Sequence, residues 1–156
     1  MEIRTSPIEG RGLVAVEHIA VGDVVERLGG VFVTDLELRR MIDSAGSYVD
    51  SVSVYDDVNL VLPTGSPLHF GNHSCDPTLW WLDPFMLVAR VDIRAGVEVT
   101  VDYATLTDDP DFRMDCACGA PLCRGEVTGS DWRRPDLQQR YGDHWVPVLL
   151  GRMAPG

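Results

Sequence analysis

Four cysteines are the residues of this chain best suited to hold a metal ion. Cys116, Cys118 and Cys123 lie close together, and Cys75 is the one cysteine left over. Structural zinc sites are tetrahedral and are often closed by four thiolates. We therefore predict one zinc ion bound by all four cysteines. Buried reduced thiols are the second interpretation, and a disulfide pair is the least favoured.

A zinc site closed by four thiolates has no open position, so its role is structural and any chemistry must lie elsewhere. The stretch from Leu68 to Cys75 places Asn72 and His73 beside the first cysteine. We expect the metal to bring this stretch, the C-terminal tail and Tyr103 around one small-molecule site. The tail has little evident core of its own, so we expect the residues after Asp115 to lack order without metal.

Each of these side chains also has a plainer interpretation. Asn72 could be a turn residue, although its amide can pair with a ligand edge or fix a loop carbonyl. His73 could be a hydrogen-bonded core histidine, and Tyr103 an ordinary aromatic at the end of a strand. The two glycines of Gly10-Arg11-Gly12-Leu13 permit close backbone approach, but a hairpin turn is sufficient to explain them.

The elements that must position these residues are mostly short strands between glycines and prolines. Strands are predicted at 24–28, 31–33, 47–55, 58–62, 79–82, 85–91 and 97–103. Helices are predicted at 36–44 after Thr34 or Asp35, at 135–141 with Asp131 as cap, and at 147–152. This pattern is typical of a β-rich α+β domain.

Composition narrows the function classes. The net charge of −11 argues against a direct nucleic-acid partner and suits a basic peptide, although acidity can also serve solubility alone. The N-terminus lacks the apolar region of a signal peptide, and no apolar run has the length of a membrane helix. We expect an intracellular, cytoplasmic protein with no membrane partner. The chain contains no lysine, and the sequence leaves its oligomeric state open.

Four segments occur together in a recognisable order. They are Gly10-Arg11-Gly12-Leu13, the stretch from Asn72 to Pro77, the strand from Glu98 to Tyr103, and Cys116-x-Cys118-x4-Cys123-Arg124-Gly125. Together they resemble the SET-domain protein lysine methyltransferases with a post-SET zinc motif, in particular the small stand-alone bacterial type. The resemblance covers most of the chain, from about Ile3 to Gly125.

The resemblance implies the SET-domain fold, in which small curved β-sheets surround a threaded pseudoknot. It also implies two parts, a SET domain at 1–112 and, at 113–156, a post-SET zinc segment with a helical tail. This chain departs from the family pattern at His69, where the family commonly has arginine, and at Gly71, where the family usually has an aliphatic residue. Val101 stands where some members carry an aromatic residue that tunes the number of methyl groups added.

The resemblance further implies methyl transfer from S-adenosylmethionine to the side-chain amine of a lysine in a basic protein or peptide. It makes Tyr103 the catalytic tyrosine and the four cysteines the ligands of a structural zinc ion. The implied cofactor contacts are Arg11, Gly12, Tyr48, Asn72 and His73, with Trp132 covering the adenine; Tyr48 could also be a plain sheet residue. The alternative is a catalytically inactive, zinc-stapled interaction module. A thiol redox protein ranks third because a C-x-x-C pair is missing.

Overall fold

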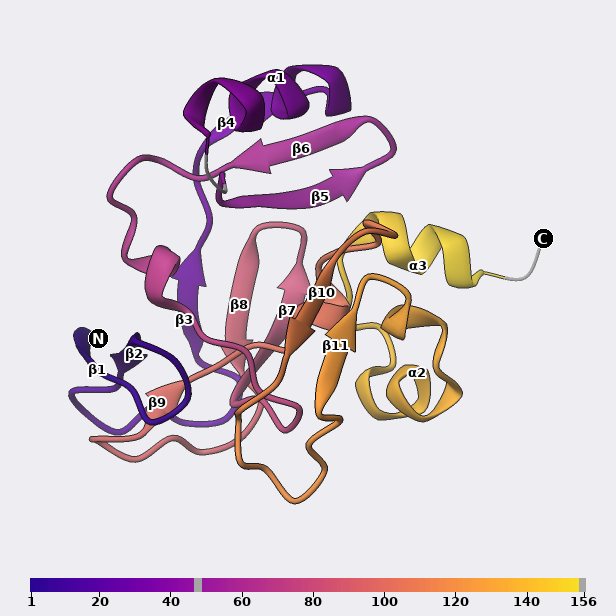
Figure 1. Cartoon of the computed structure of the whole chain (residues 1–156). Helices are drawn as coiled ribbons and strands as arrows, with labels where there is room; N and C mark the ends of the chain where they lie inside the picture. The colour runs from indigo at the N-terminus through magenta and orange to yellow at the C-terminus, as the bar shows by residue number, and fades with distance from the viewer. Residues whose placement is uncertain (47–48, 155–156) are drawn as a thin grey trace.

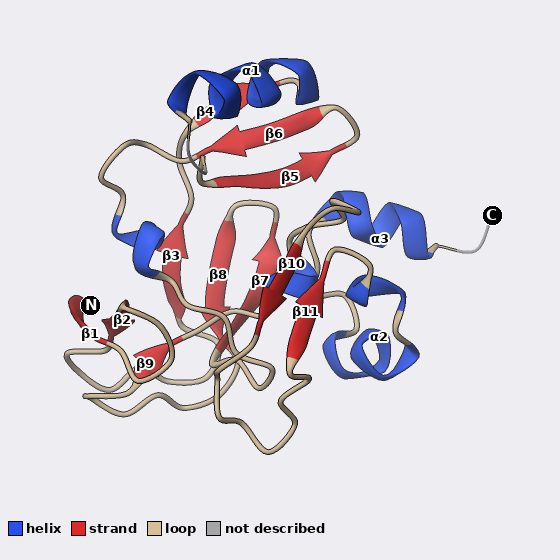
Figure 2. Cartoon of the chain, viewed as in Figure 1, coloured by secondary structure: helices blue, strands red, loops and turns tan. Residues whose placement is uncertain are grey.

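The computed structural model describes residues 1–46 and 49–154. Within these ranges, the chain forms four small antiparallel sheets with few helices (Figures 1 and 2). Tyr48, one of the predicted cofactor contacts, lies outside the described residues. Within the described ranges, no helix is both long and apolar enough to cross a membrane.

The sheets are built from strands that are mostly distant in sequence. The first sheet joins β1 (Glu2–Thr5), β2 (Arg11–Val14) and β9 (Glu98–Val99). The second joins β3 (Val24–Arg27), β8 (Met86–Ala89) and β7 (Leu79–Asp83), and the third joins β4 (Val31–Val33), β6 (Val58–Val61) and β5 (Ser51–Tyr55). The hairpin of β10 (Arg113–Asp115) and β11 (Glu126–Thr128) forms the fourth. The helices are α1 (Asp35–Ala45), α2 (Pro135–Tyr141) and α3 (Pro147–Met153), with 3-10 turns η1 (Pro67–Phe70), η2 (Tyr103–Thr105) and η3 (Asp131–Arg133).

Helix α1 begins as the sequence predicts. Thr34 is its N-cap and forms a reciprocal capping box with Glu37, and Gly46 closes the helix in the left-handed conformation. The helix lies over the β4–β6–β5 sheet, at the top of Figure 1. No residue of α1, which is described along its whole length, is buried. Local capping therefore defines this helix better than burial does.

The predicted strand 97–103 is wrong in its second half. Only Glu98–Val99 belongs to a sheet, and Val101 makes a single parallel bridge with His73. The chain then turns, because the Asp102 side chain accepts a hydrogen bond of 3.0 Å from the Ala104 N–H and caps η2. Tyr103 is thus the first residue of a 3-10 turn. The bridge lays the Asn72–Cys75 stretch beside this turn, whereas the threading of the chain stays a prediction.

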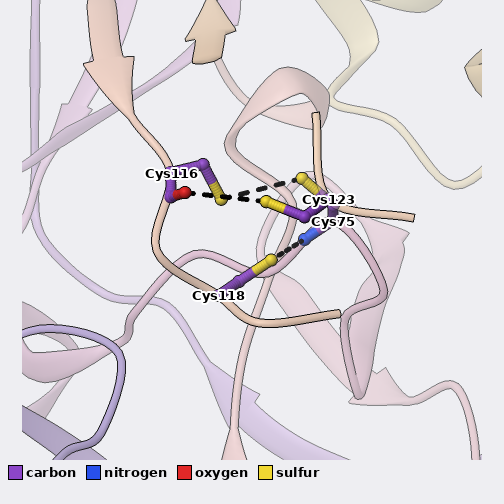
Figure 3. A group of neighbouring side chains, drawn as sticks. All are labelled: Cys75, Cys116, Cys118 and Cys123. Atoms are coloured by element: carbon purple, nitrogen blue, oxygen red, sulfur yellow. Dashed lines mark hydrogen bonds between the residues drawn. The ribbon is translucent and has the colours of Figure 1, made fainter. Parts of the chain in front are cut away.

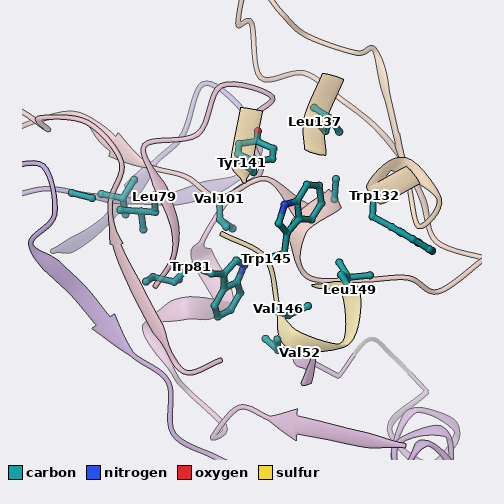
Figure 4. Close-up of a cluster of buried hydrophobic side chains, with 14 of the residues drawn as sticks. Val52, Leu79, Trp81, Val101, Trp132, Leu137, Tyr141, Trp145, Val146 and Leu149 are labelled. Atoms are coloured by element: carbon teal, nitrogen blue, oxygen red, sulfur yellow. The ribbon is translucent and has the colours of Figure 1, made fainter. Parts of the chain in front are cut away.

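The C-terminal tail supplies a large share of the hydrophobic core, contrary to the expectation that it has little core of its own. Trp145 is 2% exposed and Leu149 is fully buried, and both belong to the same cluster as Leu13 and Trp81. Figure 4 shows α2 and α3 contributing their side chains beside those of the second sheet. The hydrophobic core is therefore continuous across residue 112, and the division there that the resemblance implies stays a prediction.

The residues around α2 attach this tail to the sheets. His144 Nδ1 lies 2.6 Å from the carbonyl oxygen of Trp81, and its ring stacks on that of Trp80 at 3.5 Å between centroids. The predicted cap Asp131 is wrong, because the N-cap of α2 is Arg134, which makes no side-chain capping bond. Asp131 instead accepts a hydrogen bond from Thr128 and faces Arg124.

Candidate functional site

The structure brings Cys75 together with the three late cysteines, as the sequence predicts. The four sulfurs lie within 4.8 Å of one another, and those of Cys75 and Cys116 are 3.8 Å apart (Figure 3). A tetrahedral zinc ion with Zn–S bonds of about 2.3 Å holds its sulfurs about 3.8 Å apart. All four are free thiols. The number, type and spacing of these ligands fit a structural zinc ion.

Thiolate, rather than thiol, is the form that binds metal. Burial acts to raise the pKa of the Cys118 thiol, but hydrogen bonds from the backbone N–H groups of Cys75 and Ala120, together with those from the thiols of Cys116 and Cys123, lower the pKa to about 7. Cys116 lacks comparable compensation, and its burial raises its pKa. These hydrogen bonds therefore favour a negative sulfur at Cys118 even before a metal neutralises the cluster.

His73 connects the thiol cluster to Tyr103. Its side chain is 1% exposed, and its Nδ1 accepts a 3.1 Å hydrogen bond from the backbone N–H of Tyr103. Because Nδ1 accepts, the ring proton belongs on Nε2, which lies 3.3 Å from the sulfur of Cys75. Desolvation lowers the pKa of His73 to about 4, although nearby Asp102 opposes the shift, so the ring is neutral at pH 7. Its imidazole is bonded within the protein, as the plainer interpretation holds.

Asp102 is the fully buried charge next to Tyr103. Its two carboxylate oxygens accept hydrogen bonds of 2.7 Å from the guanidinium of Arg124, and Oδ2 also accepts one of 2.7 Å from the Tyr141 hydroxyl. Burial alone would raise the pKa of Asp102, but the hydrogen bonds and charge of Arg124 hold it below its usual value. The carboxylate is therefore ionised and joins three segments: η2, the loop after Cys123, and α2.

Asn72 fixes the first glycine motif. Its amide nitrogen lies 3.2 and 3.1 Å from the carbonyl oxygens of Glu9 and Arg11, and 2.7 Å from the carboxylate of Glu98. Glu98 also accepts hydrogen bonds from the Ser6 hydroxyl. Of the two roles open to the Asn72 amide, the structure shows the fixing of loop carbonyls. The guanidinium of Arg11 stacks on the ring of Phe70, 4.2 Å from its centroid.

Gly12 is required by close approach. A Cβ atom at this position would lie 2.0 Å from a carboxylate oxygen of Glu98 and 3.1 Å from the Asn72 amide nitrogen. We expect Gly12→Ala to displace the Glu98 carboxylate and cost about 1–3 kcal/mol of unfolding free energy, measured by denaturant titration. Gly151→Ala is the matched control because a Cβ there meets nothing within 4 Å. Equal stability of both variants would contradict the proposed contact.

Tyr103 lines a cavity of about 300 Å³ that also contacts three of the sheets and α1. Its hydroxyl donates a 2.8 Å hydrogen bond to the carbonyl oxygen of Gly71, and its ring lies against those of His73 and Phe112. Most of the remaining lining is apolar, including Leu13, Val25, Leu28, Leu38, Ile42, Val52, Leu62, Leu68, Leu79, Trp81, Leu87, Val99, Val101, Leu106 and Phe112. A phenol at the wall of an apolar cavity can orient a polar atom of a ligand that enters it.

The structure does not bring Trp132 to this cavity. The residue is 7% exposed within the hydrophobic core, Arg133 covers its ring at 4.4 Å, and its Nε1 has no hydrogen-bond partner among the described residues. Arg11, Gly12, Asn72 and His73 are likewise not among the residues that line the cavity, so the covering of the adenine by Trp132 stays a prediction. Sequence reasoning missed Arg124 and Tyr141. An arginine directly after a cysteine ligand was the available signal for the first, and Tyr141 gave none.

The fold and the site define a class of protein: small sheets joined at a four-cysteine cluster that fits a zinc ion, beside a cavity lined by a tyrosine. Residues 10–104 match the family model described as SET domain, so the chain belongs to the SET-domain family. The resemblance drawn from the four sequence segments is thereby confirmed at the level of the family, and so is the β-rich fold.

Curated relatives carry names of lysine methyltransferases. Histone-lysine N-methyltransferase TRX1 of Oryza sativa subsp. japonica is 33% identical over 138 residues, which is 78% of this chain and 13% of that protein. Histone-lysine N-methyltransferase ash1 of Drosophila melanogaster is 31% identical over 128 residues, 74% of this chain and 6% of that protein. The chain thus spans a small part of these relatives.

Solved structures show the same fold. The methyltransferase domain of human Histone-lysine N-methyltransferase SETMAR superposes with a TM-score of 0.64 at 26% identity, covering 79% of this chain and 55% of that one. KRYPTONITE, in a complex with mCHG DNA and SAH, gives a TM-score of 0.61 at 24% identity, covering 80% of this chain and 28% of that one. The second likeness concerns the fold alone.

Proposed function

We propose that this chain transfers methyl groups from S-adenosylmethionine to the side-chain amine of a lysine in a basic protein or peptide. The observation that carries the proposal is the phenol of Tyr103 at the wall of the apolar cavity, next to the stretch that bears Cys75. Membership of the SET-domain family and the names of the relatives support it. Tyr103 is the proposed catalytic residue.

The cavity suits the chemistry of this reaction. Methyl transfer from a sulfonium to an amine is an in-line displacement that requires a neutral nucleophile. A free lysine has a pKa of about 10.4, so most of it is charged at neutral pH. An apolar wall and the positive charge of the donor both disfavour the ammonium form. Tyr103 then orients the amine lone pair, and positioning together with desolvation supplies the rate.

The remaining assignments follow the first motif and the thiol cluster. We propose that the donor binds along Arg11, Gly12, Asn72 and His73, with Tyr48 as a further predicted contact. His73 is too buried to offer its ring, so its contribution would come from the backbone. Zinc held by the four cysteines would fix the stretch that carries Asn72 and His73, because Cys75 belongs to that stretch. The assignments of Arg11, Gly12, Tyr48 and Asn72 are each tested by a single variant in donor-binding calorimetry.

Charge favours a basic substrate. The chain has a net charge of −11, and the acidic residues Glu26, Asp50 and Asp109 are among those that line the cavity. Negative groups around an apolar cavity attract positively charged peptides and raise their local concentration. We therefore propose a lysine target with further basic residues near it in sequence.

Radiolabelled methyl transfer tests the proposal. Purified chain and labelled S-adenosylmethionine are incubated with a panel of lysine-rich proteins and peptides, and label incorporation is measured. Because the enzyme has no lysine, its own side chains contribute no lysine methylation to the background. We expect label on a lysine peptide and none on its lysine-to-arginine control. Donor binding by calorimetry without transfer to any substrate would instead favour an inactive module.

A further inference from the structure

We infer that Arg124 and Tyr141 are positioning residues for Tyr103 and that they act through the carboxylate of Asp102. The inference rests on the proposed function, because it assigns these residues to the geometry of the proposed catalytic tyrosine. Neither side chain lines the cavity, so neither is expected to touch substrate. Their effect would be to fix where the Tyr103 hydroxyl lies.

The contacts on Asp102 are unusually complete. The side chain has 0% exposure, and that of Arg124 has 5%. The guanidinium spans both carboxylate oxygens at 2.7 Å each, and the Tyr141 hydroxyl adds a third short bond. Arg124 Nε also lies 2.9 Å from Asp131, which places a second carboxylate on its outer side. The planar fork of arginine permits such bidentate pairing, whereas lysine provides a single point of charge.

The position of Asp102 is transmitted directly to Tyr103. The two residues share a peptide bond, and the Asp102 carboxylate caps the 3-10 turn that begins at Tyr103. The tyrosine backbone N–H is held by His73, and its hydroxyl reaches the carbonyl of Gly71. A shift of the carboxylate would rotate this turn, and the long phenol side chain would amplify the rotation at its hydroxyl.

Stability alone is a weak reason for this arrangement. A buried ion pair loses hydration energy that apolar residues of similar size would not lose, so such pairs add little net stability. The location supplies a better reason. The backbone N–H of Arg124 donates to the sulfur of Cys75 at 3.3 Å, while its side chain holds Asp102. One residue therefore joins the metal loop to the turn that carries Tyr103.

The test compares Tyr141→Phe and Arg124→Lys with the control Arg134→Lys. Arg134 forms a bidentate pair with Asp136, but that pair is exposed, and neither residue is among the hydrogen-bond partners of Asp102 in the described part of the chain. We expect Tyr141→Phe and Arg124→Lys to lower kcat by about 10- to 100-fold while KM for the donor and the zinc content change little. The control should leave all three unchanged. If Arg124→Lys fails to fold, Tyr141→Phe still tests the inference because it removes one hydroxyl only.

A double variant separates positioning from general damage. If Tyr141 acts through Tyr103, then Tyr141→Phe should cause no further loss of kcat when Tyr103→Phe is already present. The inference would be overturned if Tyr141→Phe lowered kcat as much in the Tyr103→Phe background as in the wild-type chain. It would also be overturned if Tyr141→Phe alone lowered donor affinity as much as kcat.

A spectroscopic readout distinguishes this inference from the proposed function. With ring-labelled tyrosine, the four tyrosines give separate NMR signals, and Tyr103→Phe assigns one of them. We expect Arg124→Lys and Tyr141→Phe to move the Tyr103 signal and Arg134→Lys to leave it unchanged, whether or not any lysine is methylated. If the Tyr103 signal does not move in Arg124→Lys and Tyr141→Phe, the positioning inference is refuted. If the signal moves but the wild-type chain transfers no methyl group, only the proposed activity is refuted.

Discussion

Replacing Tyr103 by phenylalanine is expected to lower methyl transfer by about 100- to 1,000-fold, the usual cost of removing one positioned hydrogen-bonding group from a reaction centre. The variant loses the hydroxyl that bonds the Gly71 carbonyl but keeps the ring contacts with His73 and Phe112. Fold and donor affinity should therefore persist. Single-turnover transfer with labelled donor measures the rate, and calorimetry measures donor binding.

Tyr55→Phe provides the matched control for this substitution. Tyr55 lies on β5, is 52% exposed and does not line the cavity. Its loss of one hydroxyl should leave the transfer rate unchanged. If Tyr103→Phe transfers methyl groups as fast as the wild-type chain, Tyr103 is not the catalytic residue, and the proposed mechanism fails with it.

Loss of the metal should have the largest effect on structure. Zinc binding contributes about 10–16 kcal/mol of apparent free energy in small structural sites, comparable with the whole stability of a domain. We expect a chelator, or Cys118→Ser, to release zinc and to expose the loop around 113–128 to hydrogen exchange. Helices α2 and α3 should keep more protection, because Trp145 and Leu149 are buried in the common core.

Ala117→Ser is the control for the cysteine variant. Ala117 is exposed between two ligands, so the change adds the same hydroxyl to the same loop without removing a thiol. Its zinc content, measured by mass spectrometry, should equal that of the wild-type chain. A wild-type chain that contains no zinc, or a chelated chain with unchanged exchange throughout 113–128, would contradict a structural metal.

Local features were predictable where local chemistry decides them. The cap Thr34, one of two predicted candidates, and strands such as β4 and β6 follow from turn residues and side-chain hydrogen bonds within a few residues, whereas β1, β10 and β11 were not predicted. The course of residues 97–103 was not predictable, because the alternation of apolar and polar residues in this segment fits a strand throughout. The turn at Tyr103 depends on the Asp102 carboxylate, which the structure shows buried and held by Arg124.

The sequence by itself determined the thiol cluster, because four cysteines with no fifth leave a single complete set of tetrahedral ligands. Motif order likewise determined the family. Only the tertiary structure decided what surrounds Tyr103. Tyr103 is hydrogen-bonded to His73 and Gly71, and its neighbour Asp102 is hydrogen-bonded to Arg124 and Tyr141. Each of these hydrogen bonds joins residues that are 20 or more positions apart. Such contacts depend on how the chain folds back on itself, which no local pattern of residue types specifies.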